Sequence, residues 1–264
     1  MTEIDFYDVL QGQLAAFLLV LSRTSGIFLI SPFFGATNIP YRLRAVVAIA
    51  TTFLIFPVIV KETVVTAPAN VFMFAGTIAQ EIFVGWLIGF VAFVAISAIN
   101  MSGKIMDMQV GFSVANVMDP TSGQSAPLIG SFLNYLALMY FLVANGHHMI
   151  LTALVQSFRA VPLDGVIWNP SIMDFIINIT NGVFVVGMKI AMPVTFAILI
   201  TNVGMGILAR TMPQMNIFVV GIPMHLMIGT FMLSMLLPFY ILFLDVMFSD
   251  MYANISNAIR LISP

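Results

Sequence analysis

The sequence contains no cysteine. It can therefore form no disulfide bond, no thiolate metal site and no thiol nucleophile. Charge is scarce as well, since charged residues make up only 8% of the 264 residues, against about a quarter in ordinary soluble domains. The formal net charge of −2 provides no basic patch that could neutralise phosphates, so a nucleic-acid partner is not expected.

The sequence is instead rich in hydrophobic residues. Hydrophobic residues make up 61% of the chain, and the mean hydropathy is +1.07. A folded chain of this composition would expose too much apolar surface in water, so we expect an integral membrane protein. The first residues carry Glu3, Asp5 and Asp8 and lack the basic region of a cleavable signal peptide, so the first apolar segment is expected to remain in the mature protein.

Hydropathy divides the chain into six apolar segments. All are expected to be helical, because lipid tolerates only helices or closed barrels and the ten-residue alternation of barrel strands is missing. The sequence therefore predicts an all-α membrane-associated fold. The six segments are Leu10–Ile30, Leu43–Val60, Val71–Met101, Pro127–Asn145, Ile172–Leu208 and Asn216–Phe248.

Several segments are too long for a simple span. Val71–Met101 has 31 residues, or about 46 Å of helix, against a hydrocarbon core of about 30 Å. The last two segments are longer still and are interrupted by prolines, which predicts kinked helical hairpins. Amides inside these apolar runs need partners that lipid does not supply, so we expect the helices to pack largely against protein. The prolines are Pro193, Pro223 and Pro238, and the amides are Asn100, Asn134, Asn178, Asn181 and Asn202.

Motifs of catalysis are missing from the sequence. It has no phosphate-binding loop, no HExxH and no G-x-S-x-G elbow, so we expect neither an enzyme nor a cofactor. His147 and His148 are adjacent, and on a helix they would point about 100° apart. That geometry favours a hydrogen-bonding role at a helix end over a metal site.

Glu81 is a carboxylate inside an apolar segment, and such groups can mark ion or proton paths. It shares one helix face with Gly85 and Gly89, whose G-x-x-x-G spacing permits close approach of another helix. The structural interpretation is that Glu81 accepts hydrogen bonds from a neighbouring backbone or pairs with Lys189 or Arg23. The alternative is proton coupling, and Arg23 carries the same ambiguity.

The stretch MDMQVGFSVANVMDP (Met106–Pro120) interrupts the apolar pattern. Methionines gather around it, and unbranched thioethers repack easily around neighbours of different shape, which suits a seal that opens and recloses. For any single methionine, ordinary filling of an apolar helix is the competing explanation. The group near this stretch comprises Met101, Met106, Met108 and Met118, and a later group comprises Met205, Met212, Met215, Met224 and Met227.

Five stretches in a fixed order carry a family resemblance. They are RTSGIFLISPFFGATNIPYRLRAVVAIA, QEIFVGWLIGF, MDMQVGFSVANVMDP, NGHHMILTALVQSF and ARTMPQMNIFVVGIPMHLMIG. Together they resemble the FliR family, the flagellar member of the type III export-gate subunits, over nearly the whole chain. The ordered set carries the resemblance, whereas residues 1–21 and the tail beyond Phe248 contribute nothing distinctive.

The resemblance implies a single export-gate subunit, residues 1–264, within a hetero-oligomeric assembly. Residues 1–171 would be a FliP-like part, and residues 172–248 a FliQ-like helical hairpin that turns at Arg210–Asn216. Its partners would be FliP-like and FliQ-like membrane subunits, together with other export-apparatus proteins, and it would pass unfolded exported proteins using energy supplied elsewhere. The implied location is the bacterial inner membrane at the flagellar basal body, raised toward the periplasmic side.

The resemblance also implies a role for the Met106–Pro120 stretch. In the family, the loop after the third apolar segment projects into the export channel and helps to plug it, which here corresponds to residues 105–125. Gly111 would supply backbone freedom for the loop to swing aside. The implied plug residues are Met106, Met108, Gly111, Phe112, Val114, Met118, Asp119 and Pro120.

Two alternative functions stay open at the level of the sequence. The equivalent gate subunit of a virulence-type injectisome would share these features. A proton-coupled small-molecule transporter would instead need Glu81, Lys189 and Asp245 to line a hydrated path, and no inverted repeat supports it.

Overall fold

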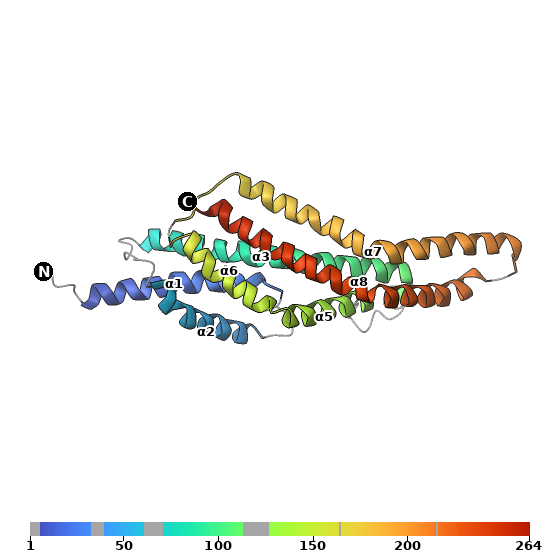
Figure 1. The fold of residues 1–264 in the computed structure, drawn as a ribbon, viewed down its shortest axis with the longest axis horizontal. Helices are drawn as coiled ribbons and strands as arrows, with labels where there is room; N and C mark the ends of the chain where they lie inside the picture. Colours follow the sequence, from blue (N-terminus) through green and yellow to red (C-terminus); the bar gives the residue numbers. More distant parts are fainter. Residues whose placement is uncertain (1–5, 33–39, 61–70, 113–126, 164, 215) are drawn as a thin grey trace. The chain divides into compact units, whose positions relative to one another are not determined.

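The structure is a computed structural model, and it describes residues 6–32, 40–60, 71–112, 127–163, 165–214 and 216–264. Every regular element among these residues is a helix (Figure 1), which confirms the predicted all-α class. The helices are α1 (Phe6–Ile30), α2 (Tyr41–Val60), α3 (Val71–Val110), α5 (Leu128–Val143), α6 (Gly146–Ala160), α7 (Ser171–Thr211) and α8 (Ile217–Ile262).

Five of the described helices are long and apolar enough to cross a membrane, judged by length and composition. The number rises to six if α5 and α6, which meet at a bend of 66°, form one broken span. The lengths agree with the predicted overlong segments, since α7 has 41 residues and α8 has 46. A straight helix of 41 residues is about 60 Å long, twice the thickness of the hydrocarbon core.

The helix boundaries correct the sequence prediction in three places. Helix α3 continues to Val110 instead of ending at Met101, α8 continues to Ile262 instead of ending at Phe248, and α6 was not predicted as a segment. For α6 and the end of α8 the cause is amphipathicity: each buries one apolar stripe and places polar residues elsewhere, so a hydropathy average misses it. The buried stripe of α6 consists of Ile150, Ala153, Leu154, Ser157 and Phe158.

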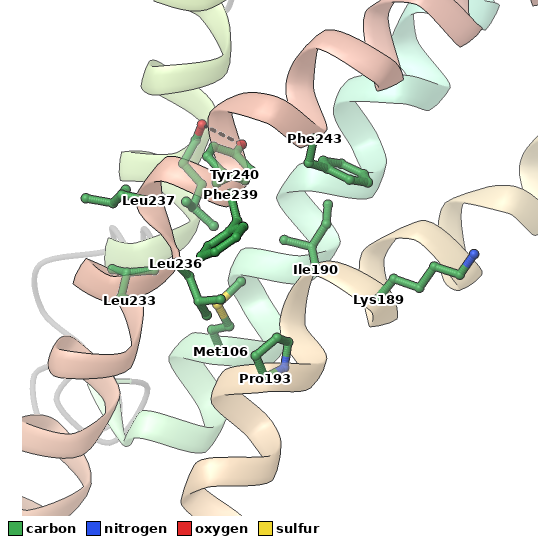
Figure 2. A pocket seen from close by; sticks show the side chains of 11 residues that line it. Met106, Lys189, Ile190, Pro193, Leu233, Leu236, Leu237, Phe239, Tyr240 and Phe243 are labelled. Carbon is green, nitrogen blue, oxygen red and sulfur yellow. Dashed lines mark hydrogen bonds between the residues drawn. The ribbon is translucent and has the colours of Figure 1, made fainter.

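The prolines do not end their helices. Helix α7 continues through Pro193, and α8 continues through Pro223 and Pro238. A proline inside a helix removes one backbone hydrogen bond and bends the axis, which the surrounding turns can absorb. Figure 2 shows such a change of direction in α7 between Ile190 and Pro193.

The chain divides into two compact units. Unit 1 contains Met1–Val94, Asn145–Asn178 and Ser249–Pro264, and unit 2 contains Ala95–Ala144 and Ile179–Phe248. Helices α3, α7 and α8 therefore contribute residues to both units, whereas α1, α2 and α6 belong to unit 1 and α5 to unit 2.

Within unit 2, the α7 and α8 segments form an antiparallel pair. Helix α7 ends at Thr211, inside the predicted turn Arg210–Asn216, and α8 begins at Ile217, directly after it (Figure 1). Nε2 of His225 lies 2.8 Å from the Asn202 amide oxygen, and Gly221 lies against the Met205 thioether. Asn202 thus has the protein partner that an amide in an apolar run was expected to need. The likeness of this pair to a FliQ-type hairpin stays a prediction.

Candidate functional site

An apolar cavity of about 310 Å³ lies in unit 2, beside the C-terminal end of α3. Its lining comes from α3, α5, α7 and α8, and Figure 2 shows Met106 and Leu236 among the side chains that converge on it. The Tyr240 hydroxyl donates to the Leu133 carbonyl oxygen at 3.0 Å, so this polar group is satisfied within the wall. The cavity therefore offers apolar contacts almost throughout.

Lys189 lines the cavity with its methylene stem. In Figure 2 its amino group points away from the other lining side chains, as expected of an amphipathic side chain that keeps its charge in a polar medium. Lys189 is exposed. Its backbone carbonyl oxygen receives no helical hydrogen bond from residue 193, because Pro193 has no N–H. This turn of α7 is therefore both bent and incompletely hydrogen-bonded.

The predicted plug residues lie partly within the described structure. Met106 is buried and lines the cavity, whereas Met108 is 72% exposed. Gly111 adopts a φ of +97°, a left-handed conformation that favours glycine, and its Cβ position faces open space. Phe112 is half-buried. Val114, Met118, Asp119 and Pro120 lie outside the described residues.

The predicted start of the plug loop at residue 105 is wrong. Ile105–Val110 forms the last turns of α3, and Gly111 ends the helix by donating its N–H to the Asp107 carbonyl oxygen at 3.2 Å. Methionine, glutamine and valine are compatible with a helix once its apolar face is buried. The glycine in the left-handed conformation, rather than the change in composition, marks the boundary.

Asp107 was not singled out from the sequence, yet it is one of the few buried charged residues among those described. Its Oδ1 accepts the backbone N–H of Ile129 at 2.9 Å, and its Oδ2 accepts that of Gly130 at 3.1 Å. The sequence did contain a signal, because Asp107 is a single acidic residue in an apolar, methionine-rich run. Burying a carboxylate there costs free energy unless it has hydrogen-bond or ionic partners.

In unit 1, Arg23 and Glu81 form a buried ion pair. Nε of Arg23 lies 2.5 Å from one Glu81 oxygen and Nη2 lies 3.0 Å from the other, and both side chains are fully buried. This is a two-pronged guanidinium–carboxylate contact, the geometry that best offsets the loss of hydration. Of the two partners proposed for Glu81, the structure pairs it with Arg23.

The rest of the Arg23 guanidinium is also satisfied. Its Nη1 donates to the Ser157 hydroxyl at 3.3 Å, its Nη2 also donates to the Val161 carbonyl oxygen at 3.1 Å, and the guanidinium carbon lies 4.1 Å from the centre of the Phe158 ring. The charge of Arg23 therefore connects α1, α3 and the C-terminal end of α6. Sequence reasoning did not identify Ser157, Phe158 or Val161.

The glycines beside Glu81 bring α3 against α1. A methyl group on Gly85 would lie 2.0 Å from the Arg23 carbonyl oxygen, and one on Gly89 would lie 3.0 Å from that of Ile27. Gly26 meets the α3 backbone in the same way. The close approach expected of the G-x-x-x-G spacing is thus present, and it places the Arg23 side chain within reach of Glu81.

Asp245 has a local partner, and the two adjacent histidines lie beside each other. Asp245, which the transporter hypothesis requires, accepts a hydrogen bond from the Tyr140 hydroxyl at 2.8 Å. His147 and His148 lie in the first turn of α6 with ring centroids 4.4 Å apart. Among the described residues, no group of three or more histidine and acidic side chains could hold a metal ion.

Residues 14–251 match the family described as bacterial export proteins, family 1. The chain belongs to this family. The flagellar biosynthetic protein FliR of Bacillus subtilis (strain 168) is 32% identical over 250 residues, covering 94% of this chain and 95% of that protein. FliR of Escherichia coli (strain K12) is 28% identical over 239 residues, 90% of each chain. FliR of Aquifex aeolicus (strain VF5) is 27% identical over 225 residues, 84% of each chain.

The resemblance to the FliR family, read from five ordered stretches, is thereby confirmed. As a bacterial export protein, the chain belongs to a family defined by transport. The match covers Arg23, Glu81, the end of α3 and most of α8, so both sites described above lie inside the family region.

Proposed function

We propose that this chain is a channel-forming subunit of the flagellar protein-export gate, through which unfolded flagellar proteins pass across the bacterial inner membrane. The observation that carries the proposal is the match to the export family over residues 14–251, together with relatives that are named flagellar biosynthetic proteins over almost their full lengths. The long apolar helices suit a subunit embedded in, or assembled at, a membrane.

The proposed partners are FliP-like and FliQ-like membrane subunits of the same complex. Residues 1–171 would act as the FliP-like part and residues 172–248 as the FliQ-like hairpin. Two features support an assembled state. In α7 only 22% of the apolar window is buried within this chain, against 56% in α3, and large exposed side chains such as Phe196 and Val203 lie on α7. Other subunits would cover them, toward the periplasmic side of the membrane.

The segment after α3 would act as the plug of this channel. Met108 and Phe112 would supply adaptable apolar contacts, together with Val114 and Met118. Asp119 and Pro120 would complete the plug segment, and Gly111 would be the hinge. The exposure of Met108 and the left-handed conformation of Gly111 support this role. Met106, which is buried in unit 2, would anchor the base of the segment.

Deletion of the gene in its host tests the export function. The expected result is loss of flagellar filament proteins from the culture medium and loss of motility, both restored by a plasmid copy. The deletion strain could instead keep its flagella and fail to export a different, non-flagellar set of proteins. That result would overturn the flagellar assignment. A Gly76→Ala copy is a suitable control, because nothing lies within 4 Å of the added methyl group.

The plug is tested by replacing both Met108 and Phe112 with alanine. Each large apolar side chain is worth about 1.5–3 kcal/mol when buried, so losing two would shift a closed state favoured by a few kcal/mol toward measurable opening. The measurement is the leak of small ions across the inner membrane in cells that carry the assembled gate. Normal assembly and export without any extra leak would mean that this segment is not the plug.

A further inference from the structure

The last turn of α3 is joined to the first turn of α5 by a single side chain. Asp107 is only 2% exposed, and its two carboxylate oxygens accept the N–H groups of Ile129 and Gly130 at 2.9 and 3.1 Å. Both acceptor oxygens are therefore used, and both bonds cross from one helix to the other.

Helix α5 has a specific need for this carboxylate. The first N–H groups of any helix have no partner inside it, and the residue at the N-cap of α5 is Pro127, which makes no side-chain capping bond. Ile129 and Gly130 are buried, so their N–H groups are shielded from solvent. A carboxylate at this positive helix end is well placed, because charge-assisted bonds and the helix dipole both stabilise it.

A glycine contact fixes the same crossing one turn earlier. A methyl group on Gly103 would lie 2.1 Å from the Cα of Gly130, so the two backbones touch where Gly103 and Gly130 meet. Gly103 and Asp107 are four residues apart and therefore share one face of α3. Met106, on a neighbouring face, lies in the cavity of unit 2 (Figure 2). The end of α3 is thus held on two sides.

We propose that Asp107 is a positioning residue of the gate: it fixes the end of α3 to the start of α5 and so sets the seal. The inference rests on the proposed plug function. Met108 and Phe112, the described residues of the proposed plug, follow Asp107 at and just beyond the end of α3. Without this bond, the end of α3 would separate from the start of α5, and Met108 and Phe112 would lose their fixed base.

A distance measurement tests the positioning role without relying on export. Because the chain has no cysteine of its own, Lys104→Cys and Leu128→Cys are the only labelling sites that this subunit contributes, and both positions are exposed. Complexes assembled with the unlabelled wild-type chain give the background from the other subunits. Dipolar EPR spectroscopy on the assembled complex then gives the distance between the two helix ends. In Asp107→Ala the distribution is expected to broaden and shift to longer distances. A control pair on α7 and α8, Val203→Cys and Met224→Cys, should not change.

Two further variants separate positioning from general damage. Asp107→Asn keeps one acceptor for Ile129 but turns amide donors toward the N–H of Gly130, so it should give a smaller shift than Asp107→Ala. It also serves if Asp107→Ala fails to assemble. Ser102→Ala is the matched control, because Ser102 is fully buried on the same helix but donates only to the Ile99 carbonyl oxygen of α3 itself.

Ion leak in cells carrying these variants gives the functional readout. The expected order is a several-fold rise for Asp107→Ala, a smaller rise for Asp107→Asn and none for Ser102→Ala. An unchanged distance in Asp107→Ala, or equal effects of Ser102→Ala, would overturn the positioning role. A broadened distance without any leak would keep the contact but overturn the plug function on which its role in the seal rests.

Discussion

Single residues decide how α1 and α3 meet in unit 1. Arg23 and Glu81 are fully buried, and each would be a costly isolated charge. Their pairing, with Ser157 and Val161 as further acceptors for the guanidinium, makes the burial tolerable. Because such a pair is stable only when complete, single substitutions should be more harmful than removal of both charges.

Glu81→Gln is the first test at this scale. Glutamine keeps one acceptor oxygen but brings amide donors against the Arg23 donors, so the buried guanidinium loses its counter-charge. Breaking a buried pair in this way costs about 3–5 kcal/mol, and the assembled complex that carries this variant should melt earlier in detergent. The double variant Arg23→Met, Glu81→Leu should recover part of that loss, because no unpaired charge remains buried. Wild-type stability of Glu81→Gln combined with abolished export would instead favour proton coupling.

Two glycines on α3 provide a matched pair for the second test. Gly85→Ala would place a methyl group 2.0 Å from the Arg23 carbonyl oxygen, whereas Gly76→Ala meets nothing within 4 Å. The first should destabilise by about 1–3 kcal/mol through overpacking. The second should be neutral or stabilising by up to about 1 kcal/mol, since alanine favours a helix. Thermal melting of the assembled complexes that carry the two variants, in one detergent, measures both effects, and equal melting temperatures would contradict the close helix contact.

At the scale of whole helices, the end of α8 belongs to the core of unit 1. Residues 249–262 bury an apolar stripe along one helix face, and the Ile262 carbonyl oxygen accepts the N–H of Ile167 at 3.1 Å. The stripe consists of Met251, Ile255, Ala258, Ile259 and Ile262.

Truncation after Phe248 tests this placement. Removing residues 249–264 would expose the apolar surface beneath the stripe, so unit 1 should become susceptible to proteases and the complex should not accumulate. Removing only Ser263 and Pro264 should have no such effect, because both follow the helix. Limited proteolysis of membranes from the two strains gives the comparison. If the protein truncated after Phe248 is stable and exports normally, residues 249–264 are not needed for the core of unit 1.

For the molecule as a whole, the exposed apolar side chains of α7 and α8 exceed what a simple span can present to lipid. Only 22% of the apolar window of each helix is buried within this chain, and both helices are longer than the bilayer is thick. Exposed apolar area of this extent marks a surface for other proteins or for lipid. The chain is therefore expected to be an obligate member of its complex.

Expression without partners tests that expectation. Alone, the chain should aggregate or be degraded, and co-expression with the FliP-like and FliQ-like subunits of the same host should restore a single peak in gel filtration. Co-expression with an unrelated polytopic membrane protein is the control for a general chaperone effect. A monodisperse, thermally stable monomer in mild detergent would contradict the expectation.

Composition and motif order were sufficient for class and family. The scarcity of charge and the apolar runs require helices in lipid or protein, because unpaired backbone groups are not tolerated there. The ordered stretches from Arg23 to Gly229 indicated the export family that the match over residues 14–251 establishes. The G-x-x-x-G spacing of Gly85 and Gly89 predicted a close helix contact, since spacing on a helix is a local property.

Pairings between distant residues were decided only by the tertiary structure. Glu81 had two possible basic partners in the sequence, and the approach of α1 to α3 selected Arg23, 58 residues away. Nothing in the sequence near Asp107 indicates its partners. They are the N–H groups of Ile129 and Gly130 at the start of α5, 22 and 23 residues further along the chain. Helix α6 and the end of α8 depend on one buried stripe each. Local composition determines which segments avoid water, but the partner of a buried charge depends on which helices touch.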